Sequence, residues 1–277
     1  MRRLVVRQAA DFNRDGFVVV DGLFHPGEVE AFRKAVKRVI QHFLSRTKNS
    51  SLEALKEVQS DEALDLGIIR LAEFDRPAFD AVYDTIWQMP EFLRLVSKPV
   101  IQRIANQLMS RGSAAPVYSF INRCRITLPG DARSQTGWHR EIFQTVPQSN
   151  FVQIWAPMIH DATIDMGPVI LCTGSHNKLM PKPEWRENTN GVSKVMFDST
   201  IADRFDQIPM TLRLGQAVFF SGTLLHGSRP NLSAKVRYAM VGLFHDVEDP
   251  HFLPPKWKFS FRGCTPRDWF DSLPDNN

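Results

Sequence analysis

The residues with the clearest potential for chemistry are His139 and Glu141, which stand two positions apart in the stretch GWHRE at 137–141. On an extended backbone, side chains at i and i+2 leave from the same face, so this imidazole and this carboxylate can bind one metal ion. His226, 87 positions after His139, can supply a third ligand. Two imidazoles and one carboxylate leave coordination positions open, which suits non-haem Fe(II) that must also bind a co-substrate and O₂.

Arg237 is a candidate anchor for a carboxylate, because it follows His226 by 11 residues at the start of a predicted strand. Ala239, Val241 and Leu243 alternate with it on one face of that strand. An arginine on this apolar face would be buried, and a buried guanidinium needs an anionic partner such as a carboxylate. The alternative is the ordinary one, a solvated charge at the end of a strand.

Further motifs accompany these residues in a fixed order. They are an N-terminal strand at 15–24, the core strand IWAPM at 154–158, DMGP at 165–168 followed by TGSH at 173–176, GQAVFF at 215–220 leading to His226, and Pro-Asn at 230–231. In order and spacing, the chain resembles the phytanoyl-CoA dioxygenase family of Fe(II)/2-oxoglutarate oxygenases from about residue 11 to about residue 246.

The resemblance implies a cofactor set and a reaction. His139, Glu141 and His226 would hold Fe(II), 2-oxoglutarate would chelate the iron with its far carboxylate on Arg237, and O₂ would be the oxidant. The products would be succinate, CO₂ and a hydroxylated substrate. The family usually has aspartate where this chain has Glu141, and halogenating relatives have a small residue there. Glutamate keeps the charge, so we expect hydroxylation and not halogenation.

The strands on either side of the metal loop carry further candidates for co-substrate or substrate contacts. Arg125 and Thr127 lie on the strand before the loop, where similar family members contact co-substrate or substrate, and Arg123 follows the same alternation. Gln153 and Trp155 share one face of the strand after the loop, and a buried amide such as that of Gln153 needs a partner that a ligand can supply. Arg123 and Arg125 can equally be ordinary surface charges.

The substrate is a small molecule whose identity the sequence does not give. The arginines that flank the metal loop hint at an anionic substrate such as a carboxylate or phosphonate, although solvated surface arginines explain them at least as well: Arg123, Arg125, Arg133 and Arg140. Two rival functions stay open, a binding protein that has lost turnover and a cupin-like metal isomerase that needs no O₂. An anchor at Arg237 argues against the isomerase.

No other motif competes with this site. Phosphate-binding glycine loops, zinc signatures and serine nucleophile elbows are missing from the sequence. The other histidines lack partners at ligand spacing, so we interpret them as structural or solvated: His25, His42, His160, His176, His245 and His251. His176 is expected to cap the Gly-Ser-His turn.

Composition and charge describe an ordinary globular chain of 277 residues, 43% hydrophobic, 23% charged and with a net charge of +4. This mild charge does not predict a nucleic-acid partner. Cys124, Cys172 and Cys264 form no close pair, which favours a reducing compartment, and no signal peptide or window of ~18 apolar residues is present. We therefore expect a cytoplasmic protein without a membrane contact; the oligomeric state is not readable.

The order of predicted elements indicates the fold class. A helix opens at Pro26 and buries Val29, Phe32, Val36, Ile40 and Phe43, and helices broken by prolines continue to about residue 109. Short strands are predicted at 17–20, 117–121, 124–128, 151–158, 169–172, 210–214, 217–220 and 237–244. Together they favour a mainly β fold with α, a double-stranded β-helix (jelly roll or cupin-like barrel) with an N-terminal helical layer. We expect one domain over 1–277: mainly helical support at 1–115, the barrel core at 116–250 with an irregular insertion at 177–206, and a tail at 251–277.

Overall fold

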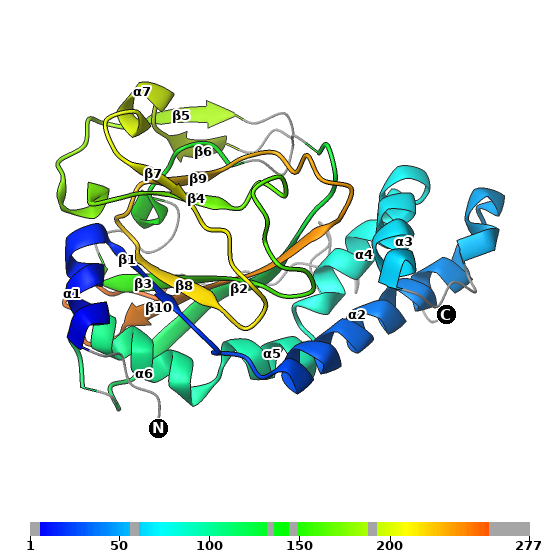
Figure 1. Ribbon diagram of the computed structural model, residues 1–277, viewed down its shortest axis with the longest axis horizontal. Coiled ribbons are helices and arrows are strands. Elements are labelled where there is room, and N and C mark those ends of the chain that lie inside the picture. The colour runs from blue at the N-terminus through cyan, green and yellow to red at the C-terminus, as the bar shows by residue number, and fades with distance from the viewer. Residues whose placement is uncertain are drawn as a thin grey trace, which may run out of the picture.

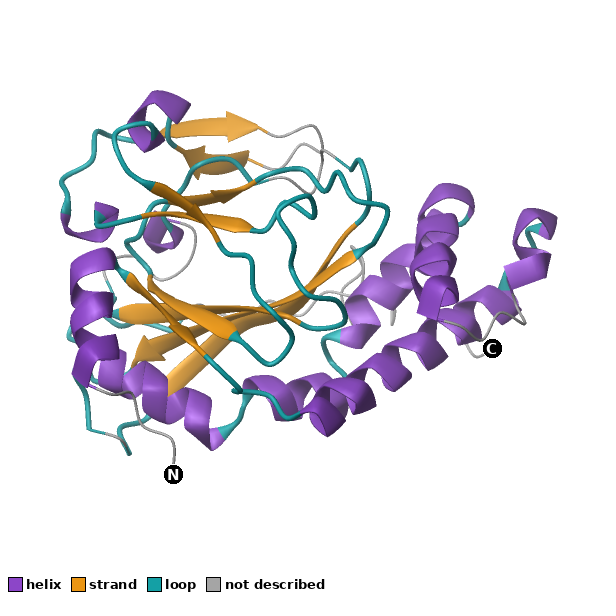
Figure 2. Cartoon of the chain, in the orientation of Figure 1, coloured by secondary structure: helices purple, strands orange, loops and turns teal. Residues whose placement is uncertain are grey.

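The computed structural model describes residues 6–55, 61–112, 114–131, 136–143, 149–187 and 193–254. A layer of helices lies under a five-stranded antiparallel sheet, and a smaller sheet lies above it on the other side (Figures 1 and 2). Among the described residues, none of the helices combines the length and apolar character that crossing a bilayer requires.

The helical layer is built largely from the first 108 residues, and prolines mark where most of its helices begin. Each of α2, α4, α5 and α6 has a proline at its first or second position, where the missing N–H costs no hydrogen bond. The helices are α1 (Val6–Asp15), α2 (Pro26–Arg46), the 3₁₀ turn η1 (Ser50–Leu55), α3 (Asp61–Phe74), α4 (Arg76–Ile86), α5 (Pro90–Val96) and α6 (Pro99–Leu108).

Helix α2 shows how the sequence sets these elements. The His25 ring accepts a hydrogen bond from the Gly27 N–H, and the Glu28 carboxylate accepts one from the His25 N–H, which together form a capping box. The apolar face buries the predicted residues except that Leu44 takes the place expected for Phe43, which is only partly buried.

The strands form two facing sheets and a hairpin. The large sheet has the order β1 (Phe17–Val20), β8 (Ala217–Ser221), β3 (Phe151–Pro157), β10 (Arg237–Asp246) and β2 (Val117–Thr127). The small sheet has the order β7 (Gln207–Pro209), β4 (Val169–Cys172) and β9 (His226–Ser228). The hairpin consists of β5 (Glu184–Glu187) and β6 (Ser193–Met196), with the short helix α7 (Ser199–Ala202) after it.

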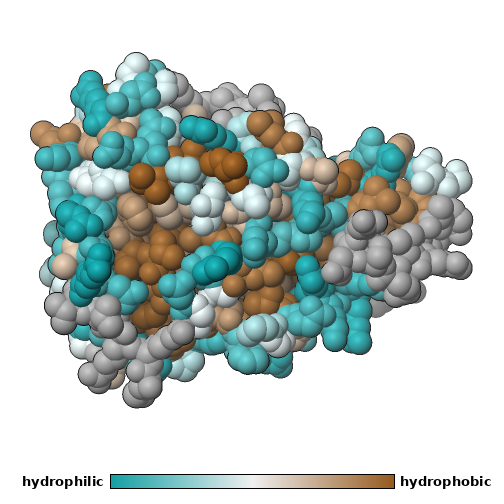
Figure 3. Space-filling model, viewed as in Figure 1, coloured by the Kyte–Doolittle hydropathy of each residue, from teal (hydrophilic) through white to brown (hydrophobic). Residues whose placement is uncertain are grey.

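The large sheet is apolar on both faces, because one face meets the helices and the other meets the small sheet. On β8, Phe219 packs into the core shared with the helices, whereas Val218 and Phe220 pack between the sheets. On β10, Tyr238 and Met240 face the helices, whereas Ala239 faces the interior of the barrel. This explains why the strands are continuous apolar runs with little polar alternation. Figure 3 shows that on the face turned to the viewer apolar side chains gather in the middle with hydrophilic ones around them.

Three expectations about strands are wrong. The two strands predicted at 117–121 and 124–128 are one strand, β2; the discontinuity is a positive φ of 54° at Ile121 and a register shift opposite Val241 and Leu243. Residues 210–214 form no strand, since Leu212 makes only an isolated bridge to Ala162 and β7 lies earlier. The insertion at 177–206 is not irregular throughout, because it contains β5, β6 and α7. The tail from residue 255 lies outside the described residues.

Replacing Phe32 by alanine tests the shared core. The Phe32 ring is fully buried and lies 5.8 Å from the Phe92 ring between centroids. We expect Phe32→Ala to lower the free energy of unfolding by about 3–5 kcal/mol in chemical denaturation, because it removes apolar contact and leaves a cavity. Phe74→Ala, at a phenylalanine that is 42% exposed, is the control and should cost far less. Equal losses for the two variants would contradict this packing.

Candidate metal centre and co-substrate pocket

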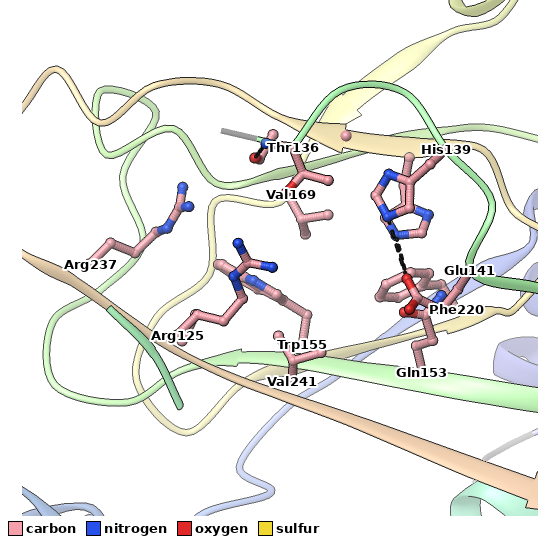
Figure 4. Close-up of a pocket in the computed structure, with 14 residues that line it drawn as sticks. Arg125, Thr136, His139, Glu141, Gln153, Trp155, Val169, Phe220, Arg237 and Val241 are labelled. Carbon is pink, nitrogen blue, oxygen red and sulfur yellow. Dashed lines mark hydrogen bonds and ion pairs between the residues drawn. The ribbon is translucent and has the colours of Figure 1, made fainter. Parts of the chain in front are cut away.

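His139, Glu141 and His226 come together as one group, with their ligand atoms within 4.8 Å of one another. The Glu141 carboxylate oxygen Oε2 lies 3.4 Å from His139 Nε2 and 3.9 Å from His226 Nε2 (Figure 4). Atoms that bind the same ion at about 2 Å each lie at most about 4 Å apart, so this spacing is close to that of a metal site.

Main-chain pairing brings the two histidines together. The His139 N–H donates to the His226 carbonyl at 2.9 Å, and the His226 N–H donates to the His139 carbonyl at 3.0 Å. Glu141 lies beyond this bridge, at the start of the 3₁₀ turn η3 (Glu141–Phe143). The extended backbone that we expected therefore reaches His139 but ends where the turn begins at Glu141. The side chains still alternate, because His139 and Glu141 line the same pocket while Arg140 between them contacts the Ser175 and Lys178 carbonyls outside it.

Both imidazoles are held in the tautomer that a metal requires. His139 Nδ1 lies 2.8 Å from the Gly137 carbonyl, and His226 Nδ1 lies 3.0 Å from the Leu224 carbonyl. A carbonyl only accepts, so each Nδ1 carries the proton and each Nε2 keeps its lone pair.

Charge in the site also suits a cation. Burial lowers the pKa of His226 to about 3, helped by His139, so this ring is neutral at physiological pH. Burial alone would raise the pKa of Glu141, but its neighbours His139, His226 and Arg125 bring it below its usual value. Two imidazoles and a carboxylate with open positions form a donor set that fits Fe(II).

Arg237 is buried, as predicted, with only 6% of its surface exposed. Its guanidinium donates to the Met166 carbonyl at 2.9 Å and to the Thr127 hydroxyl at 3.0 Å, while its buried Nε has no partner among the described residues. Burial, with the nearby charge of Arg125, lowers its pKa to about 10. Both partners of Arg237 that we find are neutral, so a ligand carboxylate would offset the burial of its charge.

One pocket joins the triad to Arg237. Figure 4 shows Arg237 and Arg125 on one side of this space and His139 and Glu141 on the other. Arg125, Gln153 and Trp155 line it, as predicted; the Gln153 Nε2 is buried without a partner in the described structure. Thr127 does not line the pocket and contacts it only through Arg237.

Two of the other flanking arginines are described, and neither lines the pocket. Arg123 is exposed, with its guanidinium 5.9 Å from the Trp87 ring centre. Arg140 is buried, but it donates to the carbonyls of Ser175 and Lys178. Arg133 lies outside the described residues.

Several lining residues were missed by the sequence analysis: Thr136, Val169, Phe220, Gly227 and Ser228. Phe220 could have been found, since it belongs to a quoted motif and its ring meets His226 edge-on at 5.0 Å. Val169 comes from a strand that reads as ordinary core. Gly227 and Ser228 immediately follow the candidate ligand His226, but strand β9 that carries them is too short to give a periodic signal.

The remaining histidines that bear on the fold have structural contacts. His160 pairs with Asp65 at 2.9 Å, and His176 Nε2 contacts the Asn13 carbonyl at 3.2 Å. His245 is fully buried, pairs with the Ser149 hydroxyl at 2.9 Å and stacks on Phe151.

Comparison with known proteins agrees with this geometry. The sequence profile of the phytanoyl-CoA dioxygenase family (PhyH) matches residues 12–239. Ectoine dioxygenase of Bordetella parapertussis is 24% identical over 276 residues, 94% of this chain and 79% of the relative. The Nocardia farcinica ectoine dioxygenase is 25% identical over 259 residues, 87% of this chain and 78% of the relative.

Solved structures share the fold at low identity. EctD from S. alaskensis with 2-oxoglutarate and 5-hydroxyectoine matches with a TM-score of 0.63 and 19% identity, over 92% of this chain and 82% of that one. The epimerase SnoN in complex with Fe³⁺, alpha ketoglutarate and nogalamycin RO matches with a TM-score of 0.58 and 17% identity, over 98% and 90%. The predicted family resemblance and the double-stranded β-helix are confirmed.

The stability of the protein should depend on the protonation of His245. Burial lowers the pKa of His245 from 6.5 to about 4, so the unfolded chain takes up this proton at a higher pH than the folded one. The contribution to stability is therefore complete above pH 6.5 and is lost as the pH falls toward about 4, by at most about 1.4 kcal/mol per pH unit. Urea denaturation across this range should show a shallower decline for His245→Gln than for the wild type. His42→Gln, at an exposed histidine, should keep the wild-type slope; a wild-type slope in His245→Gln would refute the assignment.

Proposed function

The chain belongs to the phytanoyl-CoA dioxygenase family of Fe(II)- and 2-oxoglutarate-dependent oxygenases, and from this premise we propose that it hydroxylates a C–H bond of a small metabolite. His139, Glu141 and His226 would hold the iron. The observation that carries the proposal is one pocket with a triad of two imidazoles and a carboxylate at one side and, at the other, a buried guanidinium without an anionic partner in the described structure. When bound, iron and 2-oxoglutarate supply the oxidation: O₂, 2-oxoglutarate and substrate become succinate, CO₂ and hydroxylated substrate.

Arg237 and Arg125 would bind 2-oxoglutarate through its carboxylates. Arg237 is already oriented by Met166 and Thr127, so little ordering is needed when the ligand arrives. Arg125 lines the same pocket, and its positive charge lowers the pKa of both Arg237 and Glu141. In this arrangement the two arginines would neutralise the dicarboxylate through charge-assisted hydrogen bonds.

Gln153 and Trp155 would form the wall beside the metal. Trp155 packs with the apolar residues between the sheets, so it gives the pocket a rigid apolar surface. The Gln153 amide points its Nε2 into a buried environment without a partner among the described residues, and an acceptor oxygen of a ligand would satisfy it. Together with Phe220 and Val241, they would keep bulk water away from the reacting atoms.

The substrate is proposed to be small and polar, which the names of the ectoine dioxygenase relatives favour. Four arginines flank the metal loop, and among those that the structure describes only Arg125 lines the pocket. An anionic substrate, with a carboxylate or phosphonate, would therefore depend on Arg125. Such a substrate would compete with 2-oxoglutarate for that arginine. A screen should therefore compare neutral and anionic candidates in wild type and in Arg125→Gln.

The rival functions have less support. A metal isomerase that uses no 2-oxoglutarate leaves the buried Arg237 without an anion. A barrel that binds metal or ligand without turnover would hold the histidines in the same way, and the formation of succinate distinguishes it from an oxygenase. We further propose the cytoplasm as its compartment, because Cys124 and Cys172 are free thiols in the described structure and both are buried.

Loss of one metal ligand should abolish the reaction. The protein, purified anaerobically and supplied with Fe(II), 2-oxoglutarate and O₂, should form succinate, faster when the correct substrate is present. His226→Ala should reduce succinate formation by roughly 100-fold or more, because two ligands hold the ion poorly. His42→Ala is the matched control and should keep wild-type rates. Unaltered turnover in His226→Ala would sink the assignment.

Removal of the anchor should affect 2-oxoglutarate more than iron. Arg237→Met should raise the KM for 2-oxoglutarate by roughly 10- to 100-fold, the loss expected for charge-assisted hydrogen bonds. Thr127→Val should raise it by a smaller factor, since Thr127 acts by orienting Arg237. Arg123→Met, which changes an exposed arginine of the same strand, should leave the KM unchanged. An Arg123 effect as large as that of Arg237 would mean that the co-substrate binds elsewhere.

A further inference from the structure

Arg140 stands between the two ligands of the metal loop, yet its side chain has no place in the pocket. It is buried, and its Nη2 donates to the Lys178 carbonyl at 2.9 Å and to the Ser175 carbonyl. Both acceptors belong to the segment around the 3₁₀ turn η4 (Ser175–Asn177). The backbone between His139 and Glu141 is therefore tied to that turn.

The same turn also holds the third ligand. The Ser175 hydroxyl, fully buried, accepts a hydrogen bond at 2.9 Å from the N–H of Leu225, the residue before His226. The Leu225 carbonyl accepts from the Cys172 N–H at 3.0 Å, on the other side of the turn. Ser175 thus contacts both ligand-bearing segments, one through its hydroxyl and one through its carbonyl.

The three ligands do not depend on this turn equally. The two histidines already hold each other through their reciprocal main-chain bridge. Glu141 lies outside the bridge and is fixed from two sides, by Arg140 before it and by the hydrogen bond from the Ile142 N–H to the Gly222 carbonyl at 3.1 Å after it. The contacts of Arg140 therefore bear mainly on the position of the carboxylate.

We infer that Arg140 is a positioning residue, which fixes the backbone at 141 at the distance from the two imidazoles that a glutamate spans and an aspartate does not. The inference rests on the proposed function, because it assigns Glu141 to the iron. The carboxylate now lies 3.4 and 3.9 Å from the two Nε2 atoms. Loss of one methylene would withdraw it by about 1.5 Å, and a backbone held by Arg140 cannot follow. Arg140 and Glu141 act as a matched pair.

A double-mutant cycle on iron binding tests the pair. Fe(II) would be titrated anaerobically, by calorimetry, into wild type, Arg140→Gln, Glu141→Asp and the double variant. We expect Glu141→Asp alone to raise the Fe(II) dissociation constant roughly tenfold or more. In the Arg140→Gln background, the factor caused by Glu141→Asp should be at least about threefold smaller, because the released loop can move toward the metal. If Arg140 has a merely structural role, the factor by which the double variant weakens Fe(II) binding should equal the product of the factors of the two single variants. That equality would overturn the inference, and so would unchanged binding in Glu141→Asp.

Two controls separate the possible failures. Arg33 also donates to a main-chain carbonyl, that of Ile159 at 2.9 Å, but it lies outside the metal loop. Arg33→Gln should therefore leave the effect of Glu141→Asp on Fe(II) binding the same as in the wild-type background. If Arg140→Gln proves to be unfolded in circular dichroism, the cycle is repeated with Arg140→Lys, which keeps a cation but not the forked donor, with the same expectations. Wild-type protein that binds no Fe(II) would refute the proposed function itself. If the wild type binds Fe(II) and the two substitutions weaken binding independently, only the pairing of Arg140 with Glu141 is refuted.

Discussion

The reciprocal main-chain bridge between His139 and His226 is the interaction on which the site depends. It joins a loop that follows the large sheet's edge strand to a short strand of the small sheet, so it can form only when the two sheets lie face to face. The apolar residues between the sheets, among them Val218 and Leu171, stabilise that arrangement. The hydrophobic core of the barrel thus sets the distance between two imidazoles that are far apart in the sequence.

The polar interior that results holds two buried charges whose surroundings differ. Glu141 meets two imidazoles, which a cation can bridge, and Arg237 is surrounded by neutral acceptors that orient it without cancelling its charge. Arg125 lies between these ends and influences both. A site with a positive region at one side and a cation-binding triad at the other favours a ligand that carries carboxylates, because burying like or unpaired charges is costly.

The sequence pointed to the residues that meet in the pocket, His139, Glu141, His226 and Arg237, because their residue types are unusual for their surroundings. A histidine after an apolar strand and an arginine on an apolar face are costly unless they have a purpose. The sequence did not separate Arg125 from Arg123, since both follow the same alternation in edge strand β2; only the sheet's partners decide that one lines the pocket and the other packs on Trp87. It also missed β9, because three residues carry no period.

The geometry at Glu141 shows how a spacing expected for a strand is kept where the extended chain ends. A two-residue spacing puts side chains on one face of an extended backbone, and His139 and Glu141 line one pocket while Arg140 points away from it. The bridge at His139 and the buried Arg140 hold the chain up to Glu141, where the 3₁₀ turn begins. The spacing therefore limits which residues can meet, whereas contacts remote in sequence decide how they meet. Ser175, which contacts the segments of all three ligands, is such a contact, and nothing in the local sequence of the ligands encodes it.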